Sequence, residues 1–101
     1  MTLSKEKVLQ DKCIGWLKNQ PDIWYMKTCA NGIQKAGVPD LIICAKGKFL
    51  AIELKRDDGK GVVHPRQQIN INQINNAKGI ACVCDDFERF KTIVNETKGT
   101  L

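Results

Sequence analysis

Residues 37–56 read GVPDLIICAKGKFLAIELKR, and this stretch decides the fold. Two apolar runs, residues 41–45 and 49–54, flank the dipeptide Lys46-Gly47. Short apolar runs joined by a two-residue turn that contains glycine are typical of a β-hairpin. The stretch therefore predicts two antiparallel strands joined by a tight turn at positions 46 and 47.

The hairpin register predicts a cluster of charged side chains at its open end. A two-residue turn places Asp40 directly opposite Glu53, with Cβ atoms roughly 4.5–5.5 Å apart. Like charges in such a position repel, so a fold that keeps both needs a cation nearby. Because side chains alternate along a strand, Lys55 shares the face of Glu53, about 7 Å further along. From this geometry alone, a metal or catalytic site and a set of solvated strand-end charges are equally good interpretations.

The same residues resemble a nuclease motif. Pro39-Asp40, a spacer and then Glu53-Leu54-Lys55 are similar to the PD-(D/E)XK motif. The flanking residues, Gly-Val-Pro-Asp-Leu at 37–41 and His-Pro-Arg-Gln at 64–67, resemble the VRR-NUC branch of that superfamily, the virus-type replication-repair nucleases. The resemblance extends from about residue 4 to residue 94.

The resemblance implies roles for the clustered residues. Asp40 and Glu53 would bind a catalytic Mg²⁺, for which Mn²⁺ would substitute, and the backbone carbonyl of Leu54 would be an additional ligand. Lys55 would orient or activate the attacking water, or stabilise the charge that develops. Gln67 would line the active site and position water or phosphate. Carboxylates and carbonyl oxygens are the ligands that Mg²⁺ prefers, which is consistent with these roles.

Glu6 has two interpretations. It lies in the first turn of a predicted helix that Ser4 caps, where a carboxylate interacts favourably with the helix dipole. In PD-(D/E)XK nucleases the first core helix often supplies a further metal-binding glutamate, and Glu6 is the acid in a matching place. The sequence leaves both interpretations open.

The remaining pattern predicts seven elements in the order α, β, β, β, α, β, α. This order indicates an α/β fold with a mixed central sheet flanked by helices, and it matches the α-β-β-β-α-β core of the PD-(D/E)XK nucleases. The final helix is expected to fray after Glu96. The helices are expected at residues 4–19, from His64-Pro65 to Gly79, and after Asp85-Asp86; strands at 23–29, 41–45, 49–54 and 80–84; and loops at 30–37 and 56–61.

Three basic residues are expected to contact DNA, whereas two aromatic residues are not. Lys35, Lys60 and Arg66 are predicted phosphate contacts, on loops or at a helix start. Trp24 and Tyr25 are predicted to lie in the core or an interface rather than to stack on bases. The formal net charge of +5, from 16 basic and 11 acidic residues, permits a polyanionic partner without requiring one.

Length and cysteine usage restrict the remaining possibilities. Residues 1–101 are expected to form a single domain. No membrane span and no signal peptide is expected. The protein is expected in the cytoplasm, or in the host cytoplasm if a phage encodes the chain. The five cysteines form no Cys-x-x-Cys pair and are expected to be reduced. A zinc site from His64, Cys82 and Cys84 is conceivable, but their spacing matches no familiar zinc finger.

These observations together predict a magnesium-dependent DNA endonuclease. The resemblance implies a homodimer that acts on branched DNA such as Holliday junctions, because some small stand-alone VRR-NUC nucleases act in this way. Three alternatives stay open: a sequence-specific restriction-type endonuclease, a non-catalytic nucleic-acid-binding module with the same fold, and a small interaction protein.

Overall fold

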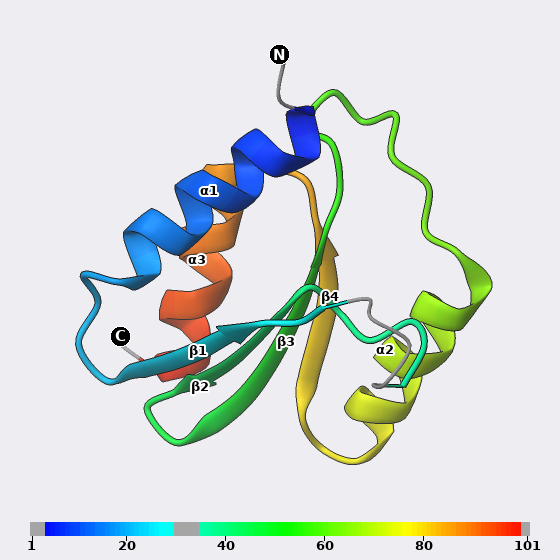
Figure 1. Cartoon of the computed structure of the whole chain (residues 1–101). Coiled ribbons are helices and arrows are strands. Elements are labelled where there is room, and N and C mark those ends of the chain that lie inside the picture. Colours follow the sequence, from blue (N-terminus) through cyan, green and yellow to red (C-terminus); the bar gives the residue numbers. More distant parts are fainter. Residues whose placement is uncertain (1–3, 30–34, 100–101) are drawn as a thin grey trace.

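The computed structural model describes residues 4–29 and 35–99, and the predicted order of elements is confirmed there. The four strands form one sheet in the order β1-β2-β3-β4. The first two pairings are antiparallel and the β3–β4 pairing is parallel, so the predicted mixed sheet is also confirmed. The elements are α1 (Lys5–Leu17), β1 (Ile23–Lys27), β2 (Leu41–Ala45), β3 (Lys48–Leu54), α2 (Pro65–Asn76), β4 (Ile80–Cys84) and α3 (Phe87–Lys98) (Figure 1).

The hairpin of β2 and β3 has the predicted register. The pairs run from Ala45 opposite Lys48 to Leu41 opposite Ile52. The turn residues at 46 and 47 have φ values of 52° and 85°. Two positive φ angles are characteristic of a type I′ turn, whose twist matches that of the flanking strands.

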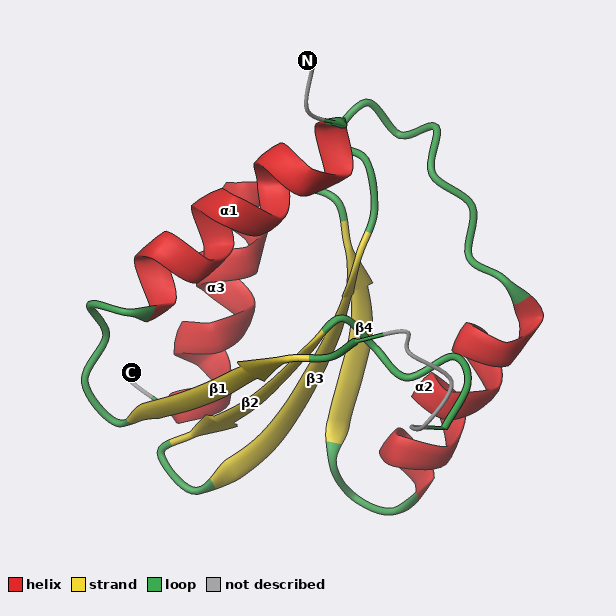
Figure 2. Ribbon diagram, viewed as in Figure 1, coloured by secondary structure: helices red, strands yellow, loops and turns green. Residues whose placement is uncertain are grey.

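The two faces of the sheet are covered differently. Helices α1 and α3 lie together on one face, and α2 lies on the other (Figure 2). Because side chains alternate, Leu50, Ile52 and Leu54 of β3 point toward α1 and α3, whereas Ala51 packs with α2. The main core lies on the α1/α3 face and consists of Leu9, Cys13, Leu17, Leu41, Ile43, Ala45, Leu50, Ile52, Leu54, Cys84, Phe90 and Val94.

The core under α2 is much smaller. Its buried members are Ala51, Ile71 and Ala81, with three partly buried neighbours. Glu53 lies on this face because it is two residues beyond Ala51 in the same strand. The sheet therefore positions the predicted acid pair on the less apolar of its two faces.

The two outer edges of the sheet also differ. On β4, Asn75 both donates to the carbonyl of Ala81, at 3.0 Å, and accepts from its N–H, at 2.9 Å. Arg89 donates to the carbonyl of Val83 at 3.2 Å. Among residues 4–29 and 35–99, no side chain forms such a bond with the outer edge of β1.

Glycine at position 79 is required by close packing after α2. A Cβ there would lie 3.0 Å from Ile74 Cγ2 and 3.1 Å from Phe49 Cδ1. The helix ends slightly earlier than predicted, at Asn76 with Ala77 as its C-cap, and the positive φ falls on Lys78. The absence of a side chain at Gly79 therefore leaves room for Ile74 and Phe49, whereas Lys78 has the positive φ of the turn.

Two sequence predictions need correction. The fraying expected directly after Glu96 is wrong for residues 97–99, because α3 continues to Lys98 and the left-handed residue Gly99 caps it. Thr97 is buried, and its hydroxyl donates to the carbonyl of Ile93 at 2.8 Å. Trp24 is not in the core, because 59% of it is exposed.

Two elements are shorter than predicted: α1 ends at Leu17 and β1 ends at Lys27. Residues 30–34 of the predicted loop at 30–37 lie outside the described residues. Within the described part of the chain, no helix combines the length and the apolar character that crossing a membrane requires.

Candidate active site

Asp40 is held at the open end of the hairpin by bonds from two other segments. It follows the fully buried Pro39 and precedes β2. The Thr28 N–H donates to the carbonyl of Asp40 at 2.9 Å, and the Thr28 hydroxyl donates to the carbonyl of Pro39 at 2.9 Å. The Leu54 N–H donates to Asp40 Oδ2 at 2.8 Å. These bonds fix both the backbone and the carboxylate of Asp40 beside the end of β3.

The loop before Asp40 is docked on α2. Gly37 has a φ of 80°, and a Cβ there would lie 2.8 Å from the carbonyl carbon of Arg66. The Asn70 side chain donates to the carbonyl of Ala36 at 2.9 Å. This close approach explains the glycine of the Gly-Val-Pro-Asp stretch, because a side chain would push the loop off the helix.

Glu53, Lys55 and Gln67 form a closed set of contacts. Lys55 Nζ lies 3.3 Å from Glu53 Oε2, and Gln67 Nε2 donates to the same oxygen at 2.8 Å. Lys55 Nζ also donates to Gln67 Oε1 at 3.1 Å. That amide oxygen accepts from the His64 N–H as well, at 3.0 Å, as part of the capping box that begins α2. The start of α2 therefore orients Gln67, which in turn orients the lysine and the glutamate.

Both carboxyl groups are destabilised in their charged forms. Burial, together with the nearby charge of Asp40, raises the pKa of Glu53 to about 7, although Lys55 opposes this shift. Burial also raises the pKa of Asp40, against the lowering effects of the Leu54 N–H, the Lys55 charge and the Lys27 charge. One lysine therefore does not neutralise the pair, and a further cation would favour both ionised carboxylates.

The carboxylate of Glu53 has room for another partner. Its Oε1 is buried and has no hydrogen-bond partner among the described residues. Buried acceptors are nearly always satisfied, so this oxygen calls for an explanation. A hard divalent cation satisfies such an oxygen without a donor proton. The acid pair therefore fits the metal that the sequence motif implies.

The Leu54 carbonyl is suitably directed for the same ion. The Leu54 N–H points toward Asp40, and in an antiparallel ladder the N–H and C=O of one residue point to the same side.

Within the described residues, however, no three His, Cys, Asp or Glu side chains are grouped closely enough to hold a metal. Glu6 is not brought into such a group, although its charge contributes to the raised pKa of Glu53.

The predicted DNA contacts lie apart from one another. Lys35 donates to Gln73 Oε1 on α2 at 3.1 Å. Lys60 is exposed in the loop after β3, and Arg66 is exposed in the first turn of α2, next to Gln67. The three cations are thus on three different segments: the loop before β2, the linker after β3 and the start of α2.

Sequence reasoning missed two residues of this site. Thr28 fixes the backbone of Asp40, and the Lys27 charge lowers its pKa. Both residues are at the end of β1, and only the antiparallel pairing of β1 with β2 brings them near Asp40. A lysine and a threonine at a strand end carry no distinctive sequence signal.

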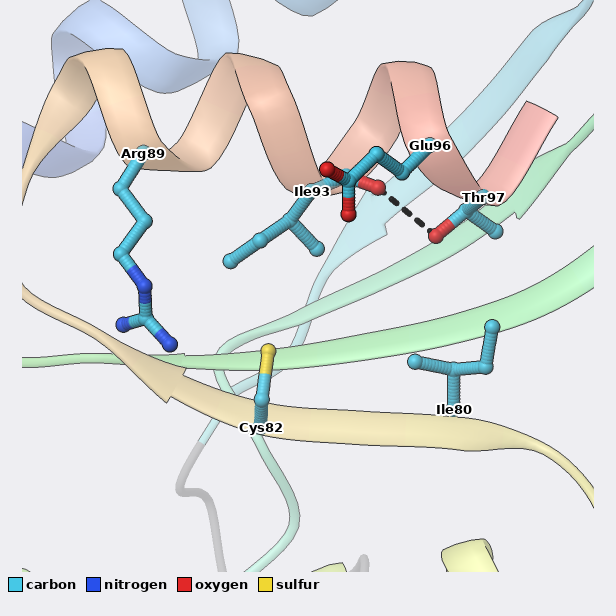
Figure 3. Close-up of a pocket in the computed structure, with 6 residues that line it drawn as sticks. All are labelled: Ile80, Cys82, Arg89, Ile93, Glu96 and Thr97. Carbon is cyan, nitrogen blue, oxygen red and sulfur yellow. Dashed lines mark hydrogen bonds between the residues drawn. The ribbon is translucent and has the colours of Figure 1, made fainter. Parts of the chain in front are cut away.

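A separate hollow lies on the opposite face of the sheet (Figure 3). It lies between β4 and α3 and has a volume of about 290 Å³. Ile80, Cys82 and Ile93 line it, together with three polar residues. Cys82 and Cys84 face α3, whereas His64 begins α2 on the other face, so the zinc alternative has no support in the described residues.

The fold is that of two solved VRR_NUC structures. One, described as a "VRR_NUC domain protein", has a TM-score of 0.76 and 22% identity, and the match covers 96% of this chain and 90% of that one. The other, described as "VRR_NUC domain", has a TM-score of 0.74 and 18% identity, covering 92% of this chain and 97% of that one. No protein-family model and no curated protein sequence matches the chain. The likeness therefore shows the fold, over nearly the whole length.

Proposed function

We propose that this chain, which has the VRR_NUC fold, is a metal-dependent DNA endonuclease that hydrolyses phosphodiester bonds. The observation that carries the proposal is the unpartnered, buried Oε1 of Glu53 beside Asp40. Two carboxyls with raised pKa values and an unsatisfied oxygen are a poor arrangement for stability alone. They are a good arrangement for binding a divalent cation.

Asp40, Glu53 and the Leu54 carbonyl would hold Mg²⁺, or Mn²⁺ in its place. The bound ion supplies a Lewis acid for the phosphoryl oxygens and lowers the pKa of a water ligand. Lys55 has a mostly buried ammonium, 3.3 Å from Glu53 Oε2, and it would orient the attacking water or stabilise the charge that develops. Gln67 is a positioning residue, because it bonds both Lys55 and Glu53.

Glu6, in the first turn of α1, is proposed as an additional ligand. Its charge already raises the pKa of Glu53, so the two carboxylates interact electrostatically. Binding of an ion between them would convert that repulsion into attraction.

The proposed substrate is DNA, contacted through its phosphates by Lys35, Lys60 and Arg66. The net charge of +5 is compatible with a polyanion, and Arg66 directly precedes Gln67, which bonds Glu53. On the resemblance to small VRR-NUC nucleases, we infer a single 101-residue domain that acts as a homodimer on branched DNA such as Holliday junctions. A two-fold dimer presents two sites to the symmetry-related strands of a junction.

The test is a cleavage assay with purified protein, Mg²⁺ and a panel of four-way junction, flap and linear duplex DNA. Wild type is compared with Asp40→Asn and with Asp57→Asn, which changes an exposed loop acid. We expect cleavage of the junction by wild type and Asp57→Asn, and DNA binding without cleavage by Asp40→Asn.

Other outcomes identify the alternatives. Binding without cleavage of any DNA by wild type, in Mg²⁺ or Mn²⁺, would identify a non-catalytic nucleic-acid-binding module. Cleavage of linear duplex at one recurring sequence would identify a restriction-type endonuclease. Absence of both metal binding and DNA binding would leave an interaction protein.

A further inference from the structure

An exposed aromatic row crosses the sheet beyond the part that α2 covers. Trp24 and Phe49 are 59% and 47% exposed, and Met26 is 44% exposed. Cys44 pairs with Trp24 on one side and with Phe49 on the other, so Trp24, Cys44 and Phe49 form one row across β1, β2 and β3, while Met26 pairs with Ile42 in the next row on the same face. Large apolar side chains gathered on a small protein's surface mark a binding surface more often than chance exposure.

The row lies on the same face of the sheet as the acid pair. Phe49, Ala51 and Glu53 alternate with the core-facing residues of β3, so their side chains share one face. Phe49 precedes Glu53 by four residues, which is about 13 Å along an extended strand. The aromatic row is therefore at the turn end of the hairpin, and the candidate active site is at its open end.

A hollow adjoins the row on the side of α2. It has a volume of about 280 Å³ and is lined by Phe49, Ile74, Ala77 and Gly79. The wall formed by the Phe49 ring is aromatic, and the remainder is aliphatic or backbone. A flat, largely apolar part of a ligand that is bound on the aromatic row would also contact this hollow.

The charges around the row are mainly positive. Lys46 is in the hairpin turn, and Lys78 directly precedes the glycine that packs on the Phe49 ring. The acid beside the turn is Asp22, whose carbonyl accepts from the Lys46 N–H. The exposed lysines attract a polyanion and would repel the same surface of a second copy.

We propose that Trp24 and Phe49 form a stacking platform for unpaired bases of a DNA strand that extends from the acid pair along this face of the sheet. The identity of the ligand as DNA rests on the proposed function; the platform itself rests on the aromatic row and its lysines. Every base has a flat face that stacks on an aromatic ring, so such a platform tolerates any sequence. Phosphates of the same strand would lie beside Lys46 and Lys78.

The chain carries its own reporter and control for a test. Trp24 is exposed on the platform, whereas Trp16 packs edge-on against Phe90 on the other side of the sheet, with ring centroids 6.1 Å apart. A stacked base quenches the fluorescence of the tryptophan it contacts. The probe is a single-stranded oligothymidylate, titrated at low salt in EDTA so that no DNA is cleaved. We expect quenching in wild type and Trp16→Phe, and none in Trp24→Phe.

Affinities give a second measurement. Trp24→Ala and Phe49→Ala should each weaken oligothymidylate binding by roughly five-fold or more, while fully paired duplex binding changes little. Because both side chains are on the surface, the variants should fold, which circular dichroism checks. Equal loss for single-stranded and duplex DNA would overturn the proposal, because it would indicate no role for unpaired bases.

Two further outcomes would also overturn it. One is the absence of Trp24 quenching. The other is a Trp24→Ala variant that changes from dimer to monomer in sedimentation while its oligothymidylate affinity stays unchanged, since this face would then be an interface between copies. Failure of the nuclease proposal is recognised separately, because protein that binds the oligonucleotide in EDTA but cleaves no DNA in Mg²⁺ retains the platform.

Discussion

The two faces of the sheet have different compositions although the same strands build them. Toward α1 and α3 the sheet presents a large apolar core whose twelve residues are buried, with a hollow at the edge between β4 and α3. Toward α2 it presents a small apolar cluster, a buried glutamate and lysine, and an exposed aromatic row. A single strand, β3, contributes to both, because its alternate residues serve the two faces.

Because of this difference, one face mainly stabilises the fold, and the other holds the residues of the candidate active site. The α1/α3 face gains hydrophobic free energy from nearly every residue that it buries. The α2 face instead buries Glu53 and Lys55, which carry a desolvation cost that their mutual attraction offsets only in part. Substitutions on the two faces should therefore affect different measurements.

The largest expected effect is on the free energy of unfolding from a change on the α1/α3 face. Phe90 is fully buried there, and Phe90→Ala should cost about 3–5 kcal/mol, a large share of the stability of a domain this size. Ile71→Ala on the α2 face should cost less, about 2 kcal/mol, because its cluster is smaller. Urea denaturation in EDTA measures both. Equal costs would show that the two faces share the stabilisation evenly.

The next effect is on cleavage alone. Glu53→Gln keeps the shape of the side chain but removes its charge, so the cleavage rate should fall by at least roughly 100-fold. The free energy of unfolding in EDTA should change much less than the cleavage rate, because removing a buried carboxylate and removing the partner of Lys55 have opposite effects on it. Glu88→Gln is the matched control, since Glu88 is exposed on α3. A loss of stability that parallels the loss of cleavage in Glu53→Gln would contradict the expectation that substitutions on the two faces affect different measurements.

Stability of the metal-free protein should depend on pH through Glu53. Its pKa is raised from 4.5 to about 7, so the folded state binds more protons than the unfolded state between these values. The free energy of unfolding should therefore fall as pH rises from about 4.5 to about 7, by an amount on the order of 1–3 kcal/mol. The raised pKa of Asp40 acts in the same direction.

Urea unfolding in EDTA across this pH range tests the prediction. Glu53→Gln should reduce the slope, and Mg²⁺ should restore stability at the upper end, because it binds the folded state. A free energy of unfolding that rises through the window in wild type would show that other groups dominate the titration.

The smallest effect concerns Glu6. As a ligand, it should leave the free energy of unfolding within a few tenths of a kcal/mol when changed to glutamine, while Mg²⁺ affinity falls several-fold. Asp11→Asn, in the same helix, is the control for a general loss of negative charge. Calorimetric titration with Mg²⁺ compares the variants, and an unchanged affinity in Glu6→Gln would remove Glu6 from the ligand set.

The hairpin was predictable because its determinants are local. A two-residue turn sets the register, and strand alternation then places Glu53 and Lys55 on one face. Gln67 was predictable from helical periodicity, since it shares the face of α2 that packs on the sheet.

The remaining features depend on contacts between distant segments. Trp24 has the pattern of a buried strand residue, but α2 covers only part of its face of the sheet, which no local pattern records. Thr28 holds Pro39 and Asp40 across eleven and twelve residues of sequence. Burial of the last turn of α3 depends on the end of the helix packing back onto the protein.

The sealed edge of β4 limits how copies of this chain can join. Asn75 and Arg89 occupy backbone groups of Ala81 and Val83 that an added strand would need. Among the strands that the structure describes, growth of the sheet from one chain to another is therefore favoured through β1 rather than β4. Two chains joined at β1 would present a sealed edge at each end, so edge pairing would stop at a pair and would not continue into a filament.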